Sequence, residues 1–190
     1  MQKIILVGGG GHCRSVIDVI EEEKRYEIVG IVDKKELIGT KIFGYEVIGC
    51  DDDLKNLIKK TSNAIVTVGQ IKSNTIRVRL FKLLKQLGYT LPSIISPLAY
   101  VSKYAFIDEG SVIMHDVLVN ANVKVGKNCI INSKALLEHD VVVKDNSHIS
   151  TASVLNGGVV VEQDTFVGSG AIIKEGVEVS GFIKAKELVI

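Results

Sequence analysis

Tryptophan is absent from this chain of 190 residues, and aromatic residues make up only 5% of it. Such a composition favours a core of small aliphatic side chains over an aromatic-rich sandwich. Charge of one sign is not in excess either, because the formal net charge is +1. No strong electrostatic field therefore favours a nucleic acid or an anionic membrane as a partner, and we expect neither.

Long apolar runs are also missing. No stretch approaches the roughly 20 apolar residues that a membrane-spanning helix needs. The short apolar run at the N-terminus, from Met1 to Val7, is too short for the core of a secretory signal peptide. The three cysteines, Cys13, Cys50 and Cys129, have no metal-ligand spacing and an odd number, which favours reduced thiols in the cytoplasm.

A hexapeptide repeat is what the chain does have, and it runs from residue 95 to residue 184. Every sixth position is aliphatic: Ile95, Val101, Ile107, Ile113, Val119, Val125, Ile131, Leu137, Val143, Ile149, Leu155, Val161, Val167, Ile173 and Val179. A second restricted position follows each of these after four residues, and most of its occupants are small or β-branched. A helix has a period near 3.6 and a simple strand a period of 2, so a period of six predicts a hexapeptide β-helix.

Three hexapeptides form one coil of such a β-helix. Positions that differ by 18 in residue number are therefore expected to stack about 4.8 Å apart, the spacing of neighbouring strands. The aliphatic residue of each hexapeptide points into the prism and the small residue fits near a corner. The repeat has room for about five coils.

The first 92 residues follow a different pattern. Apolar strands are expected at residues 3–7, 27–32 and 63–68, and helices at residues 13–23, 51–60 and 73–86. Alternation of this kind predicts a small Rossmann-like α/β domain with a parallel sheet. The two prolines, Pro92 and Pro97, mark the passage into the β-helix. We therefore predict an α/β domain at residues 1–92 and an all-β parallel β-helix at residues 93–190.

A glycine run, Gly8 to Gly11 followed by His12, lies between the first strand and the first helix. Glycines let the main chain approach phosphate oxygens, and a helix N-terminus offers N–H donors and a positive dipole. Asp33 ends the second strand, where such folds place a carboxylate for ribose or base recognition. A tight turn without a ligand is the alternative. A redox dinucleotide fits less well, because a domain of this length holds only half of a doubly wound fold.

His139 is the candidate general base. It is flanked by Glu138 and Asp140, and a carboxylate can fix the tautomer of an imidazole and stabilise the imidazolium. Gly157 lies three hexapeptides further on, one coil above, and can offer its N–H to a developing oxyanion. The alternative for His139 is a solvated corner residue. Glu138, Asp140 and Asp145 are expected to be solvated residues at corners of the β-helix rather than metal ligands, and we predict no metal site.

Two further histidines are less well defined by spacing. His115 precedes an aspartate, as His139 does, but four hexapeptides separate the two, which is not a whole number of coils. We expect His115 on a different face, as a surface or interface residue. His148 lies one and a half hexapeptides beyond His139, and spacing alone does not decide whether it faces the same cleft.

These motifs together resemble a known family. It comprises bacterial sugar acyltransferases in which a small nucleotide-binding domain precedes a left-handed β-helix, such as the bacillosamine-pathway acetyltransferase, perosamine N-acetyltransferase and sialic acid O-acetyltransferases. The resemblance covers nearly the whole chain, and its carriers are residues 7–12, 31–33, 68–69, 132–140, 146–150 and 155–158.

The resemblance implies a left-handed β-helix, a homotrimer, and acetyl-CoA bound in a groove between neighbouring subunits. It implies that His139 is the catalytic base and that Asp140 orients it. It also implies that His148 is a second catalytic histidine, near the acetyl group. The residues implied to bind acetyl-CoA are His148, Gly157, Gly168, Gly170 and Ala171. Those implied to bind the nucleotide sugar are Gly9, Gly10, Gly11, His12, Asp33 and Gly69.

The C-terminus departs from the family pattern. Relatives end in a Gly-x-Pro-Ala-Lys segment near the CoA nucleotide, whereas this chain has Ile183-Lys184-Ala185-Lys186 without a proline. Lys184 or Lys186 is expected to replace the missing contacts.

The expected function is acetyl-CoA-dependent N-acetylation of a nucleotide-activated amino sugar, of the UDP-4-amino-4,6-dideoxy-hexose type, for glycan biosynthesis. The alternatives are O-acetylation of a sialic acid-like sugar, since amine and hydroxyl acceptors both need a base and an oxyanion donor, and a non-catalytic trimeric partner of a sugar synthase.

Overall fold

The computed structural model describes residues 1–190, which divide into two compact units. One unit comprises Met1–Gly69 and Ser73–Pro92. The other comprises Ser93–Ile190 together with the short segment Gln70–Lys72. This segment lies within the range expected for the α/β domain, yet it packs with the β-helix. None of the helices is long and apolar enough to span a bilayer.

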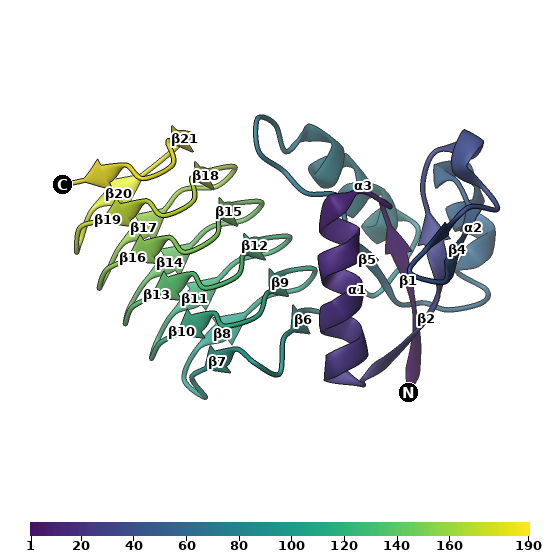
Figure 1. The fold of residues 1–190 in the computed structure, drawn as a ribbon, viewed down its shortest axis with the longest axis horizontal. Coiled ribbons are helices and arrows are strands. Elements are labelled where there is room, and N and C mark those ends of the chain that lie inside the picture. Colours follow the sequence, from purple (N-terminus) through teal and green to yellow (C-terminus); the bar gives the residue numbers. More distant parts are fainter. The chain divides into compact units, whose positions relative to one another are not determined.

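The first unit is an α/β domain built on a five-stranded sheet of order β3-β4-β2-β1-β5 (Figure 1). The strands are β1 Gln2–Val7, β2 Tyr26–Val32, β3 Lys41–Ile42, β4 Tyr45–Gly49 and β5 Ala64–Val66. The pairs β1–β2, β1–β5 and β2–β4 are parallel, as the alternation of strands and helices predicts. The two long helices are α1 Gly11–Glu23 and α3 Thr75–Gln86.

Two features of this unit differ from the prediction. The hairpin of β3 and β4 was not expected; its turn runs through Phe43 and Gly44, whose φ angles are both positive. The prediction of a helix at residues 51–60 is wrong about its length. The structure has the 3₁₀ turn η2 Asp51–Asp53 there, followed by the single turn α2 Leu54–Leu57. Asp53 accepts the Cys50 N–H at 2.9 Å and fixes the tight first turn. Another 3₁₀ turn, η1, spans Lys35–Leu37.

The core of the α/β unit lies where the sheet packs against α2 and α3. Ile5, Val32 and Val66 from the strands contact Leu54 and Leu84 from the helices, and all five are fully buried. Burial of such side chains stabilises the fold by about 1.5–3 kcal/mol each. The ends of β1, β2 and β4 meet at the same edge of this layer, which therefore carries the loops that form a pocket.

The second unit is a parallel β-helix of two-residue strands stacked in coils (Figure 1). Its strands are β6 Ile94–Ile95, β7 Tyr100–Val101, β8 Phe106–Ile107, β9 Val112–Ile113, β10 Leu118–Val119, β11 Lys124–Val125, β12 Ile130–Ile131, β13 Leu136–Leu137, β14 Val142–Val143, β15 His148–Ile149, β16 Val154–Leu155, β17 Val160–Val161, β18 Phe166–Val167, β19 Ile172–Ile173, β20 Glu178–Val179, β21 Phe182–Ile183 and β22 Leu188–Val189.

Register confirms the expected coil of three hexapeptides. Leu118 pairs with Leu136, and Leu136 pairs with Val154, each three hexapeptides further on. The last coil differs, because Phe166 pairs with Phe182 and this coil is therefore slightly shorter. The second residue of each inner strand points inward, so that Val119, Leu137 and Leu155 are fully buried one above another.

A third restricted position lies at the corners, three residues after each aliphatic position. Most of its residues have a positive φ, and they are largely Asn, Asp or Gly; Asn122, Asn128, Asp140, Asn146 and Asp164 are examples. These are the residue types that tolerate the left-handed region. The corners therefore impose a sequence requirement of their own, in addition to the aliphatic period.

Candidate active site

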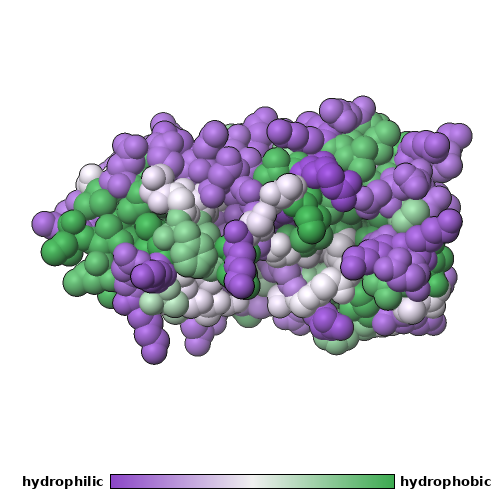
Figure 2. Space-filling view, turned by 90° about the horizontal axis from the view of Figure 1, so that it is seen from above, coloured by the Kyte–Doolittle hydropathy of each residue, from purple (hydrophilic) through white to green (hydrophobic).

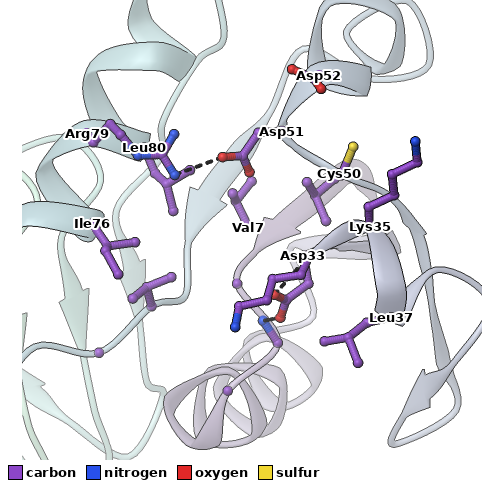
Figure 3. Close-up of a pocket in the computed structure, with 17 residues that line it drawn as sticks. Val7, Asp33, Lys35, Leu37, Cys50, Asp51, Asp52, Ile76, Arg79 and Leu80 are labelled. Atoms are coloured by element: carbon purple, nitrogen blue, oxygen red, sulfur yellow. Dashed lines mark hydrogen bonds and ion pairs between the residues drawn. The ribbon is translucent and has the colours of Figure 1, made fainter.

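A pocket of about 860 Å³ opens at the carboxyl ends of β1, β2 and β4 in the α/β unit (Figure 3). Four of the predicted substrate residues line it: Gly9, Gly10, Asp33 and Gly69. Gly11 and His12, predicted with them, do not line this pocket. They belong to the first turn of α1. Gly69 lies against the His12 side chain, because a Cβ added at Gly69 would be 3.3 Å from the Cβ of His12.

The glycine loop approaches Asp33 closely. The Gly9 N–H donates to Asp33 Oδ2 at 2.5 Å, and the Lys34 N–H donates to Oδ1 at 2.7 Å. A Cβ at residue 9 would lie only 2.7 Å from Asp33 Oδ2, so the position requires glycine. Asp33 thus holds the loop in place, and each of its oxygens retains a lone pair for a ligand.

The N-terminus of α1 can bind an anion. Gly10 is the N-cap, so no side chain caps the helix, and no acidic residue occupies the first turn. Added Cβ atoms at Gly10 and Gly11 would meet nothing within 4 Å, which leaves their main chain open to a ligand. Unpaired N–H groups and the helix dipole make such a terminus suitable for phosphate.

Charged residues that were not predicted to belong to the site complete this pocket. Arg79, from α3, donates to Asp51 Oδ2 at 2.8 Å, and both side chains line the pocket together with Lys35 (Figure 3). Asp51 follows β4, a strand that was not predicted, so no sequence signal placed it beside Asp33. An exposed pair of this kind contributes little to stability, and its charges stay accessible to a ligand.

His139 and Asp140 form an exposed pair on the β-helix. His139 Nδ1 lies 2.8 Å from Asp140 Oδ2, and the two side chains are 64% and 54% exposed. The Asn122 amide, one coil below, donates to Asp140 Oδ1 at 2.7 Å. These bonds, the one from Asn122 first and the one from His139 second, lower the pKa of Asp140. A charged carboxylate therefore holds the imidazole, and Nε2 is left as the basic atom.

Gly157 lies one coil above His139, as the coil length predicts. The Gly158 N–H donates to the main-chain oxygen of His139 at 2.9 Å, which fixes the register. A Cβ at residue 157 would be 2.8 Å from His139 Nε2. Glycine is thus required for the ring to occupy this position, and the Gly157 N–H donates to no main-chain oxygen of the stacked coils.

His148 is buried, at 6% exposure, in a different environment. Its Nδ1 lies 2.6 Å from the main-chain oxygen of Gln70, and its Nε2 lies 3.3 Å from Nδ2 of Asn132. The ring of Phe166 packs edge-on against it, with centroids 5.2 Å apart. Phe182 stacks on Phe166 in turn, with centroids 5.0 Å apart.

Within one chain, the predicted acyl-site residues occupy two edges of one sheet face. His139, Asp140 and Gly157 lie in the turns that follow β13 and β16. Gly168, Gly170 and Ala171 lie in the turn that precedes β19, and His148 lies in the sheet on that side. The edges are separated by one side of the prism, which is one hexapeptide or up to about 20 Å. The chain alone does not bring these two groups together.

The sheet face between the two edges is apolar. Its outward side chains come from the first residue of each strand: Tyr100, Leu118, Leu136, Val154, Ile172 and Leu188. We call these six residues the apolar face. Hydrophobic side chains gather over the C-terminal coils, at the left of Figure 2. Ile172 and Leu188 of the apolar face are 43% and 65% exposed, and Phe182 of the neighbouring sheet is 57% exposed.

The C-terminal segment continues the β-helix. An added Cβ at Gly168 would collide with the main chain of Lys184 and Ala185, so the last coil packs directly on the turn around Gly168 that is predicted to bind acetyl-CoA. Lys184 and Lys186 are both exposed there.

His115 lies in a different place from His139. Its Nδ1 is 2.7 Å from Ser96 Oγ. Its main-chain oxygen accepts a hydrogen bond from the Lys134 N–H, which does not belong to the turn that holds His139.

Comparisons with known proteins agree with this architecture. Residues 3–84 match the family model described as the PglD N-terminal domain. A search of curated proteins gave no match. Among solved structures, a mutant of perosamine N-acetyltransferase from Caulobacter crescentus, in complex with CoA and GDP-perosamine, has a TM-score of 0.92 and 29% identity, over 100% of this chain and 89% of that chain.

The acetyltransferase domain of PglB from Neisseria gonorrhoeae is similar as well. One structure of it has a TM-score of 0.91 and 27% identity, over 100% of this chain and 92% of that chain. Another, in complex with acetyl coenzyme A, has a TM-score of 0.69 and 28% identity, over 96% and 93%. The expected fold class, a Rossmann-like domain followed by a left-handed β-helix, is confirmed, and so is the resemblance to sugar acyltransferases of this fold. The protein is an acyltransferase.

Proposed function

We propose that this protein transfers the acetyl group of acetyl-CoA to the amine of a nucleotide-activated amino sugar, of the UDP-4-amino-4,6-dideoxy-hexose type. The observation that carries the proposal is the group formed by His139, Asp140 and Gly157. A basic imidazole nitrogen, a carboxylate that orients it, and a glycine N–H lie together on a fold whose similar structures contain CoA and GDP-perosamine.

His139 would act as the general base. With its Nδ1–H directed to Asp140, its Nε2 lone pair would accept a proton from the sugar amine as the nitrogen attacks the thioester carbon. The C–N bond forms, the C–S bond breaks, and the proton passes on to the departing CoA thiolate. Base catalysis of this type contributes about 10²- to 10⁴-fold to the rate.

The Gly157 N–H would stabilise the tetrahedral oxyanion. It is a main-chain donor fixed by the coil register, so no reorganisation is needed when the charge develops. Gly168, Gly170 and Ala171 would line the pantetheine arm, because their small side chains leave the main chain accessible. Lys184 and Lys186 would meet the CoA phosphates, since they are exposed beside that turn.

The pocket of the α/β unit would bind the nucleotide diphosphate. The open N-terminus of α1 suits the phosphates, and Asp33 has lone pairs left for the nucleoside. Gly9, Gly10 and Gly69 would border the ligand. His12 and Gly11, in the first turn of the helix, would meet it from the helix N-terminus.

We further propose a homotrimer in the cytoplasm. The apolar face has six apolar side chains in a row, and contiguous patches of this kind are seldom left exposed by monomers. Packing three apolar faces around a common axis would place the edge with His139 of one subunit beside the edge with Gly168 of the next. Each site would then be completed by a neighbouring chain.

A substrate panel tests the proposal. Purified protein is incubated with acetyl-CoA and UDP-, GDP- or CMP-activated sugars that carry either a free amine or only hydroxyls, and thiol release is measured. The expected result is turnover with a UDP-amino sugar. Turnover only with the sugars that lack an amine would indicate O-acetylation. No turnover with any sugar would favour the alternative in which the protein is a non-catalytic partner of a sugar synthase.

A further inference from the structure

Gln70 attaches the segment Gln70–Lys72 to the β-helix at two points. Its main-chain oxygen lies 2.6 Å from His148 Nδ1, and its side-chain Nε2 donates to the main-chain oxygen of Asn146 at 2.7 Å. The residue is 5% exposed. A buried residue with two short polar contacts holds its neighbours in a defined geometry.

The contact with His148 has a chemical direction. A carbonyl oxygen only accepts hydrogen bonds, so the proton between the two groups belongs to Nδ1 of His148. In a neutral imidazole Nε2 is then an acceptor, and the amide nitrogen of Asn132, 3.3 Å away, has the donor that it needs. Both ring nitrogens are thereby assigned by their partners.

We propose that Gln70 is a positioning residue that fixes His148 in its Nδ1–H tautomer, with Nε2 as a hydrogen-bond acceptor. In this state His148 cannot donate from Nε2 to an acyl oxygen; it orients the Asn132 amide instead. The relevance to catalysis rests on the proposed function and on the family resemblance, which implies that His148 lies near the acetyl group. The tautomer itself does not depend on that function.

The side chain of Gln70 is the part that a substitution can remove. The carbonyl that contacts His148 belongs to the main chain and stays in any variant of residue 70. What a variant loses is the hydrogen bond from Gln70 Nε2 to Asn146, which holds this carbonyl in place. The other amide atom, Oε1, is buried and has no protein partner. Because an unpaired buried acceptor is costly, Gln70→Met would remove both the anchor and this cost, and we expect it to fold.

The test is a long-range ¹H–¹⁵N spectrum of the histidine rings, recorded on labelled full-length protein without substrate. The His148 signals are assigned by their loss in His148→Asn. In the unmodified protein we expect the Nδ1–H pattern. In Gln70→Ala and Gln70→Met we expect a mixture of tautomers, while Gln163→Ala, an exposed glutamine on the same β-helix, keeps the original pattern.

Kinetics provide the second measurement. Loss of the anchor is expected to lower kcat by about 10- to 10²-fold, with KM for acetyl-CoA little changed, because a misplaced group affects the reacting geometry more than binding. An Nε2–H pattern in the unmodified protein, or an unchanged pattern in both Gln70 variants, overturns the proposal. Absence of any acetylation by the unmodified protein overturns the proposed function instead, and leaves the spectrum to decide on Gln70.

Discussion

Gly157→Ala separates catalysis from stability at the proposed base. The added methyl would lie 2.7 Å from His139 Cε1 and 2.8 Å from Nε2. Carbon atoms in favourable contact are about 3.5–4.0 Å apart, so the ring must move by about 1 Å. His139 is exposed and free to move, but doing so lengthens its bond to Asp140 and displaces Nε2 from its position.

The expected loss is therefore in turnover alone. A displacement of about 1 Å can lower the rate by about 10²-fold, and we expect kcat to fall by this factor while KM for both substrates changes little. The N–H of residue 157 is retained, so the loss is assigned to His139. Stability should not fall, because Gly157 has no left-handed φ and alanine there restricts the unfolded chain, which adds about 0.4–1 kcal/mol.

Thiol release and thermal unfolding measure the two effects. Gly88→Ala is the contrasting control: its φ is +87°, nothing lies nearer than 3.9 Å, and it lies far from His139 in sequence and in another unit. It should lose about 1 kcal/mol of stability to backbone strain and retain its kcat. Full activity of Gly157→Ala would refute the assignment of His139 Nε2 as the base at this position.

Two further predictions concern the histidines and a buried thiol. His139→Ala should lower kcat by about 10²-fold or more, and Asp140→Asn by less, while His115→Ala should keep nearly full turnover. Equal losses for the two histidine variants would show that the active site lies on another face of the β-helix. Burial raises the pKa of the Cys13 thiol from 9.0 to about 11. Between these values the folded state binds more protons than the unfolded state, so stability falls as the pH rises through this window, by about 3 kcal/mol in total. Urea unfolding at pH 8.5 and pH 11 should show about 2 kcal/mol of this loss, because the folded thiol is half ionised at pH 11, and Cys13→Ala should lack this contribution.

The β-helix could be predicted from the sequence because its rules are local and repeated. Each hexapeptide fixes one inward side chain, and the constant coil length turns a difference of 18 in residue number into a contact. This is why the position of Gly157 above His139 was predictable. The corner positions carried a signal too: Asn122 and Asp140 both have a left-handed φ and are one coil apart, so their hydrogen bond follows from the same arithmetic.

The parts that were missed depend on contacts distant in sequence. The strand Tyr45–Gly49 is short and pairs with β2 only through its end, so no period identifies it. Without it, Asp51 was assigned to a helix N-terminus rather than to the pocket. Gln70 contacts Asn146 and His148, which lie 76 and 78 positions further along the chain. Nothing in the residues around Gln70 indicates that it packs with the β-helix.

The arrangement of the two edges leads to the last prediction. Along the prism, one coil corresponds to about 4.8 Å, so height follows from residue number. His139 and His148 differ by half a coil, or about 2.4 Å in height, although they lie on opposite sides of the apolar face. In a threefold trimer whose axis is parallel to the prism, the two histidines of neighbouring chains would therefore be nearly level. His115 would lie about 6 Å below His139, more than one coil away.

Mixed trimers test this arrangement. Chains with His139→Ala and chains with His148→Ala are each expected to retain about 1% of the activity or less when alone. When equal amounts are unfolded and refolded together, one site in four combines an intact His139 edge with an intact His148 edge, so activity should return to about one quarter of the unmodified level. Refolding each variant alone is the control, and its activity should stay at that residual level. If each site were contained in a single chain, no mixture would restore activity, because every chain would still lack one of the two histidines.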